Sequence, residues 1–141
     1  MTVSLVRRYR FSASHLYRRP EWGDEENLAR FGKCSIEPGH GHNYRLTLFV
    51  TGTPDLETGF VVDLVHLDRL VSEQVLEALD HRHINHAVPE FAPGGLVPSS
   101  EQLVLWIRDR LLPALPEGAR LAGLQLFEDD DLGAEWRPSE S

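Results

Sequence analysis

The stretch Phe31–Tyr44 reads FGKCSIEPGHGHNY and holds the only cysteine of the chain, together with two histidines in His-x-His spacing. Residues i and i+2 of a strand point to the same side of a sheet, so His40 and His42 can present two imidazoles to one metal ion. Histidines at a strand entry can instead serve only nearby backbone groups. The parity continues through the apolar series Tyr44, Leu46, Leu48 and Val50, which predicts a strand over residues 44–52 with the histidine pair on its buried side.

Cys34 lies six residues before His40, and its position allows two interpretations. It is either a metal ligand or a thiol held close to a Lewis acid. The step to His40 is wider than the usual two to four residues of a cysteine knuckle. A nearby dication lowers the pKa of a thiol, which favours Cys34 as a thiolate base or nucleophile.

Length and composition indicate one soluble domain over residues 1–141. The chain has a mass of 16.0 kDa, 41% hydrophobic residues and 26% charged residues. A net charge of −8 argues against nucleic acid or an anionic membrane as partner. The amino terminus lacks the apolar core of a signal peptide, and no apolar run is long enough to span a membrane. A single cysteine excludes an intrachain disulfide, and we expect a cytoplasmic protein.

The first part of the chain predicts a half-buried strand that ends at a third histidine. Apolar residues alternate with mostly polar ones from Val3 to Ala13, and His15 keeps the same parity, so it is the candidate third ligand. Residues 16–33 are polar and irregular, which predicts a long loop that covers a site.

The middle of the chain predicts a short third strand and a helix. Phe60–Val62 follow a turn, and Asp63 then stands at the N-cap position of a helix that runs from Leu64 to Leu79. His66 falls on the exposed side of that helix. Asp80 and His81 follow its end, where a carboxylate–imidazole pair is one interpretation and a solvated aspartate the other, because adjacent residues do not usually face each other. We expect His83 and His86 at the surface.

The last third predicts a loop, a second helix and a final strand. After the loop of residues 88–98, Ser99 and Gln102 resemble a capping box for a helix that Pro113 and Pro116 end. Residues 120–127 predict a strand whose buried parity continues to Glu128. A carboxylate there is costly unless it is paired, and a ligand with two N–H donors would pair it; the alternative is a glutamate exposed to water. We expect the tail after Gly133 to be dispensable.

The order of elements indicates an α+β domain with an antiparallel sheet covered on one face. Zinc bound by His15, His40 and His42 would keep one position open, as catalytic zinc does, unless Cys34 closes it. A base, a possible relay pair, a Lewis acid and a buried carboxylate together suggest proton transfers on a polar heterocyclic substrate.

In their order, the motifs of this chain resemble the family of the 6-pyruvoyl-tetrahydropterin synthases, which also holds the 6-carboxy-tetrahydropterin synthases of queuosine biosynthesis. The six-residue step from Cys34 to His40 is similar to the pyruvoyl branch. Ser99 or Ser100 replaces a threonine common in the family, and Trp136 stands where a tyrosine is usual. The resemblance rests on Phe11–His15, Asp24–Asn27, Phe31–Cys34, Gly39–Tyr44, Leu79–His81 and Glu128.

This resemblance implies a tunnelling fold (T-fold), with an antiparallel four-stranded sheet and two helices packed on one face. It also implies trimers that close a barrel, which would remove the open sheet edges, and a homohexamer made of two trimers. The sites of the family lie between subunits, so Cys34 and the Asp80–His81 pair need not meet within one chain.

The resemblance further implies a lyase that eliminates triphosphate from 7,8-dihydroneopterin triphosphate with no redox cofactor. Zinc on His15, His40 and His42 would bind the side-chain oxygens of the substrate, Cys34 would act as general base, and Asp80 and His81 would relay protons. Glu128 would anchor the pterin through its 2-amino group and ring N–H, and could share in the relay. Glu101, Ser99 and Ser100 would line the pterin pocket.

Three alternatives stay open at this point. A 6-carboxy-tetrahydropterin synthase would use the same substrate and lose part of the side chain. A zinc-stabilised binding module without turnover would use Cys34 as fourth ligand. A generic zinc hydrolase ranks last, because no glutamate base stands beside the histidine pair.

Overall fold

A five-stranded sheet forms the centre of the computed structural model, which describes residues 3–139. Strands β1 (Val3–His15) and β2 (His40–Gly52) pair antiparallel along their whole length, from Val3 opposite Gly52 to His15 opposite His40. Strand β4 (Arg120–Phe127) pairs antiparallel with β2, and β5 (Gly133–Trp136) with β4. The two-residue strand β3 (Arg82–His83) lies parallel to the end of β1, so the order is β3-β1-β2-β4-β5.

The sheet has five strands instead of the four predicted, and the fifth lies in the tail that was expected to be dispensable. After Glu128 the chain turns on Asp129, whose carboxylate accepts hydrogen bonds from the backbone N–H groups of Asp131 and Leu132 at 2.8 Å each. This turn returns the chain along β4 as β5, and the half-buried Trp136 packs against the core. Phe60–Val62 form no strand.

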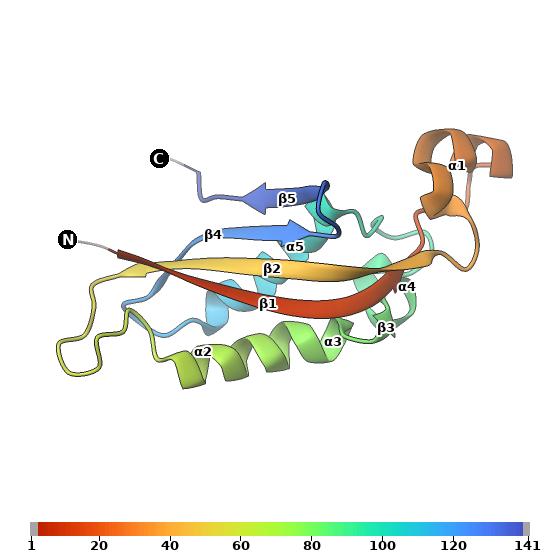
Figure 1. Ribbon diagram of the computed structural model, residues 1–141. Coiled ribbons are helices and arrows are strands. Elements are labelled where there is room, and N and C mark those ends of the chain that lie inside the picture. Colours follow the sequence, from red (N-terminus) through yellow and green to blue (C-terminus); the bar gives the residue numbers. More distant parts are fainter. Residues whose placement is uncertain (1–2, 140–141) are drawn as a thin grey trace.

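Two helical rods cover one face of the sheet (Figure 1). The first comprises α2 (Leu64–Val71), a π-helical turn (Ser72–Leu76) and α3 (Glu77–Leu79); the second is α5 (Ser100–Leu111), followed by a 3-10 turn (Leu112–Ala114). Both predicted caps are confirmed: Asp63 accepts from the N–H groups of Val65 and His66, and Ser99 from that of Gln102. The core between the rods and the sheet consists mostly of buried Leu, Val and aromatic side chains from both layers.

The expected loop of residues 16–33 contains a helix. Helix α1 (Asp24–Phe31) and a 3-10 turn (Gly32–Ser35) stand at the end of the sheet where β1 leaves and β2 enters (Figure 1). The strand β2 also begins earlier than predicted, at His40 instead of Tyr44. As a result, Cys34 lies in a 3-10 turn and His40 in a strand, and neither lies in an irregular loop.

Short elements connect the two rods beside β3. Helix α4 (Ile84–Ala87) and a 3-10 turn (Pro89–Phe91) lie within the connection, and Ile84 and Phe91 are fully buried. His86 is exposed as predicted, but His83 is half-buried, because its ring stacks on that of His86 at 4.1 Å and its Nε2 lies 2.8 Å from the Pro38 carbonyl oxygen. Among residues 3–139, no helix combines the length and the apolar character needed to cross a membrane.

Candidate metal centre and active site

Three histidine rings converge at the end of the β1–β2 ladder. His15 is the last residue of β1 and lies directly opposite His40, and His42 follows on the same side of β2. The ring centroids are 5.0 Å apart for His15 and His40, 4.8 Å for His15 and His42, and 4.9 Å for His40 and His42. The predicted convergence of the three side chains is therefore present in the fold.

The hydrogen bonds of these histidines leave nitrogen atoms available for a ligand. His15 is fully buried, and its Nδ1 lies 2.9 Å from the Tyr44 hydroxyl oxygen. The Nε2 atoms of His15 and His42 are buried and have no hydrogen-bond partner among the described residues. Burial, followed by the nearby histidines, lowers the pKa of His15 to about 3, so its imidazole is neutral, the form that binds metal. Ligand atoms of His15 lie within 4.8 Å of those of Cys34 and His40 in one group, and of those of His42 and Glu128 in another, so these buried nitrogens fit a metal site.

Cys34 lies beside this cluster on the 3-10 turn. Its Sγ is 3.7 Å from His40 Nε2, and potential ligand atoms of His15, Cys34 and His40 all lie within 4.8 Å of one another. Burial and the Glu128 carboxylate raise the pKa of the Cys34 thiol. A thiolate at this position therefore requires a cation close by.

Gly39 allows the close approach of the two strand ends. Its φ of 97° lies in the left-handed region, and a Cβ atom there would overlap the His15 carbonyl oxygen. The chain can therefore turn from Pro38 into β2 directly against His15, which places His40 opposite it.

Glu128 borders the cluster of the three histidines. It follows β4, is 5% exposed, and its Oε2 lies 3.8 Å from His42 Nε2 and accepts from the Tyr17 hydroxyl at 3.4 Å. Burial, followed by the Asp129 charge, raises the pKa of Glu128, and the Glu101 charge contributes in the same direction. The expectation of an inward-facing carboxylate is confirmed, and the interpretation of Glu128 as a solvent-exposed residue is wrong.

The start of α5 lies close enough to Glu128 for Glu101 to affect its pKa, although Glu101 is exposed. Ser99 uses its hydroxyl to cap α5, at 3.2 Å from the Gln102 nitrogen. Ser100 is 3% exposed, and its hydroxyl has no hydrogen-bond partner among the described residues. Ser100 therefore has its whole hydroxyl available for a contact outside the described residues, whereas Ser99 keeps its O–H donor and one lone pair for such a contact.

Asp80 and His81 form the carboxylate–imidazole pair that sequence spacing disfavoured. Asp80 Oδ1 lies 3.0 Å from His81 Nδ1 and accepts from the Ser12 N–H at 2.9 Å. His81 has a φ of 61°, and this left-handed conformation turns its ring back toward the preceding side chain. The Ser12 hydrogen bond, and then His81, keep the pKa of Asp80 below its ordinary value. In the described part of the chain, no hydrogen bond or ion pair joins this pair to Cys34.

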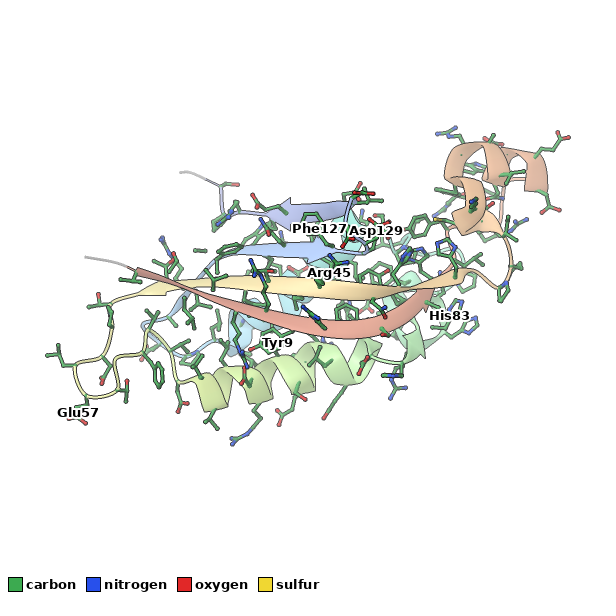
Figure 2. All side chains as sticks on the ribbon, in the orientation of Figure 1. Tyr9, Arg45, Glu57, His83, Phe127 and Asp129 are labelled. Atoms are coloured by element: carbon green, nitrogen blue, oxygen red, sulfur yellow. The ribbon has the colours of Figure 1, made fainter. Side chains whose placement is uncertain are left out.

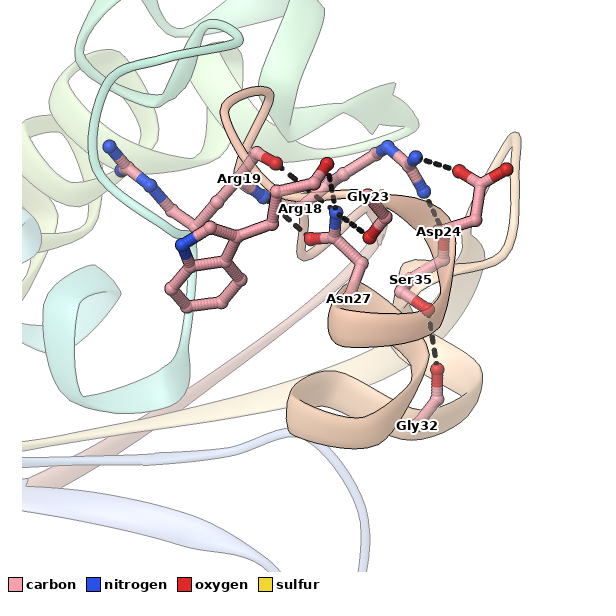
Figure 3. Close-up of polar contacts among 8 residues, drawn as sticks. Arg18, Arg19, Gly23, Asp24, Asn27, Gly32 and Ser35 are labelled. Atoms are coloured by element: carbon pink, nitrogen blue, oxygen red, sulfur yellow. Dashed lines mark hydrogen bonds and ion pairs between the residues drawn. The ribbon is translucent and has the colours of Figure 1, made fainter.

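Several supporting residues were missed by the sequence reasoning. Asn27 is fully buried: its side-chain oxygen accepts from the Arg19 N–H, and its amide donates to the carbonyls of Arg19, Trp22 and Gly23 (Figure 3). Arg18 pairs with Asp24 in the same cluster. The Tyr17 N–H donates to the Cys34 carbonyl at 2.8 Å. These contacts fix the segment before Cys34, and in the sequence only Asp24–Asn27 gave a signal, as part of the family resemblance.

Comparison with known proteins decides the family. A family model described as 6-pyruvoyl tetrahydropterin synthase matches residues 4–139. This chain belongs to that family. The 6-pyruvoyl tetrahydrobiopterin synthases of Pongo abelii and Homo sapiens are 41% and 39% identical to it over 129 residues, which cover 92% of this chain and 87% of each relative. A dihydroneopterin monophosphate aldolase of Pyrococcus furiosus is 29% identical over 135 residues, 96% of this chain and 97% of the relative.

The solved structures agree with the membership in the 6-pyruvoyl tetrahydropterin synthase family. The structure of the Caenorhabditis elegans 6-pyruvoyl tetrahydropterin synthase superposes with a TM-score of 0.89 at 29% identity and covers 99% of this chain and 97% of that one. The T-fold expectation is confirmed, with five strands in place of four.

Proposed function

We propose that this chain is a zinc-dependent 6-pyruvoyl-tetrahydropterin synthase that converts 7,8-dihydroneopterin triphosphate to 6-pyruvoyl-tetrahydropterin with elimination of triphosphate. The observation that carries the proposal is the convergence of His15, His40 and His42, two of them with buried and unpartnered Nε2 atoms, beside the Cys34 thiol. Family membership supplies the pterin chemistry.

The three histidines would hold the zinc ion, which supplies Lewis acidity toward the side-chain oxygens of the substrate and so acidifies the adjoining C–H bonds. Cys34 accepts a proton from the side chain as general base, which its position 3.7 Å from His40 supports. Asp80 orients the His81 imidazole through their 3.0 Å contact, and this pair relays protons during tautomerisation. The carbon–oxygen bond to triphosphate breaks, and no external oxidant or reductant takes part.

Glu128 anchors the pterin by accepting from its 2-amino group and ring N–H, and Glu101, Ser99 and Ser100 line the pocket. The near-complete burial of the Glu128 carboxylate supports this role, because a buried carboxylate gains most from two N–H donors. Ser100 offers a buried hydroxyl, whereas Ser99 shapes the pocket as the cap of α5.

We further propose that the active form is a homohexamer, a dimer of trimers, with sites between subunits. The separation of the Asp80–His81 pair from the contacts of Cys34 supports a site completed by a second copy. Among residues 3–139, no strand lies beside the outer edge of β5 or beside that of β1 before Ala13, so these edges can pair between copies.

The proposed reaction is tested by incubating zinc-loaded protein with 7,8-dihydroneopterin triphosphate and identifying the products by mass spectrometry, with Cys34→Ala in parallel. We expect a pyruvoyl-pterin and free triphosphate with the wild type, and a loss of turnover of about 100-fold or more in a variant that still binds zinc. A carboxy-pterin with acetaldehyde would assign the chain to the 6-carboxy-tetrahydropterin synthase branch.

One observation favours a second candidate of another class, a zinc-stabilised pterin-binding module without turnover. The Cys34 Sγ shares a 4.8 Å cluster with ligand atoms of His15 and His40, so it can reach the position of a fourth ligand. In that case Cys34→Ala would lose zinc and thermal stability together, and the wild type would bind pterin without product.

A further inference from the structure

The sheet face opposite the helices collects positive charge in an acidic chain. On this face β1 and β2 place Arg8 opposite Thr47, Arg10 opposite Arg45, and Ser12 opposite Asn43. Directly opposed side chains have their Cβ atoms about 5 Å apart, where two like charges destabilise a sheet. An anion beside or between the two guanidinium groups would relieve this repulsion.

Two adjoining hollows share this arginine pair. One, of about 640 Å³, is lined by Arg10, Arg45 and Asn43 together with Ser12, Asp80 and His81. The other, of about 340 Å³, lies farther along the strands and is lined by Arg8, Arg10, Arg45, Thr47, Gln125 and Asp130. Figure 2 shows Arg45 in the middle of the sheet, away from its ends. The hollows form a polar track that leads from the Asp80–His81 pair onto the arginines.

The charges on this track leave a net positive surplus. Arg45 is paired with Asp130 at 2.6 Å, but the Asp130 side chain is 86% exposed and can swing away. Among residues 3–139, Arg8 and Arg10 have no ion-pair partner. Asn43 accepts from the Ser12 hydroxyl at 2.7 Å, which leaves its amide N–H groups for another acceptor. Guanidinium and amide donors of this kind suit phosphate oxygens.

The metal centre is a poor place for the same anion. It is bordered by Glu128, and Glu101 and Asp129 are close enough to raise the pKa of Glu128. These three carboxylates would offset the two positive charges of a bound zinc ion, so this end of the site would attract a chain of phosphates only weakly. Lys33, exposed beside Cys34, is the one basic side chain in the FGKC segment.

We propose that Arg10 and Arg45, assisted by Arg8 and Asn43, bind the triphosphate chain of the substrate and select it over monophosphate or unphosphorylated pterins. The inference rests on the proposed function, in which Asp80 and His81 act on the side chain that carries the phosphates. A substrate held by the histidines and Cys34 of one copy would meet the His81 of a second copy, and would extend its phosphates along the hollow that His81 and Arg10 share in that second copy.

The test combines direct binding with kinetics in the zinc-loaded protein. Inorganic triphosphate is titrated calorimetrically into the wild type, the double variant Arg10→Gln/Arg45→Gln, and the control Arg69→Gln, which removes an exposed arginine from α2 behind the sheet. We expect the double variant to lose about tenfold or more in affinity and the control to match the wild type. The KM for 7,8-dihydroneopterin triphosphate should rise by a similar factor with a much smaller change in kcat, and binding of unphosphorylated dihydroneopterin should not change.

The outcomes separate this subsite from the proposed reaction. Arginine-dependent binding of inorganic triphosphate without turnover would keep the subsite and reject the reaction. Turnover with a KM unchanged in the double variant would keep the reaction and reject the subsite. A tenfold effect in Lys33→Gln, with none in the double variant, would also overturn the proposal and assign the phosphates to Lys33.

Discussion

Tyr44 determines which nitrogen of His15 is free for a metal. Its hydroxyl lies 2.9 Å from His15 Nδ1, so Nδ1 can donate to it while Nε2 keeps its lone pair. Removing such a partner typically weakens metal binding by about ten- to hundredfold. We expect Tyr44→Phe to lower zinc affinity by this factor in a chelator competition, without loss of fold, because Phe retains the ring stack on Phe11 at 4.9 Å.

Tyr9→Phe is the matched control, because it removes a part-buried tyrosine hydroxyl that donates to Asp68 instead of contacting a histidine. Equal zinc affinity in wild type and Tyr44→Phe would show that Tyr44 does not orient His15.

Strand parity was sufficient to predict His15, His40 and His42 as one cluster. It could not predict the Asp80–His81 contact, since that contact depends on a left-handed backbone at His81 that no residue type signals.

The ion pair between β1 and α2 predicts how stability depends on pH. Arg7 and then Tyr9 donate hydrogen bonds to Asp68 and hold its pKa below the ordinary value. A depressed pKa contributes stability that is fully present above the unfolded value of about 3.9 and is lost as pH falls through the folded value. Asp68→Asn should therefore lower the unfolding free energy by about 1 kcal/mol at neutral pH, and by less in acid, once the pH has fallen through the lowered folded pKa.

Urea unfolding of both proteins across this pH range measures the difference, and a gap that persists in acid would contradict the assignment. Asp109→Asn provides a control, because among residues 3–139 Asp109 pairs only with its sequence neighbour Arg108 and connects no two elements. Helices α2 and α5 were predictable, because the N-cap residues Asp63 and Ser99 mark their first turns in the sequence. Helix α1 was not, because Asn27 holds it through backbone carbonyls that only the fold brings together.

The free edges of the sheet determine how whole molecules can associate. The backbone N–H of Ser12 donates to the Asp80 carboxylate, and its C=O accepts from the His81 N–H, so both groups point away from β2. Backbone groups alternate in direction along an antiparallel pair, so those of Arg10, Arg8 and Val6 also point away from β2. Beyond Ala13 and Ser14, which pair with β3, this edge has no strand beside it in the described chain. Sequence could not predict the opposite edge, because β5 is only four residues long and depends on β4 for its partners.

If copies pair through the β1 edge, a proline at Val6 should abolish assembly while leaving the β1–β2 ladder intact, because it removes one outward N–H. Sedimentation velocity should give about six times 16.0 kDa for the wild type and for the control Val6→Ala, and a smaller species for Val6→Pro. Turnover should fall with assembly, since the proposed site needs Cys34 from one copy and His81 from another. If Val6→Pro still assembles fully, the interface does not use the β1 edge. If a monomer is active, Asp80, His81 and Cys34 act within one chain.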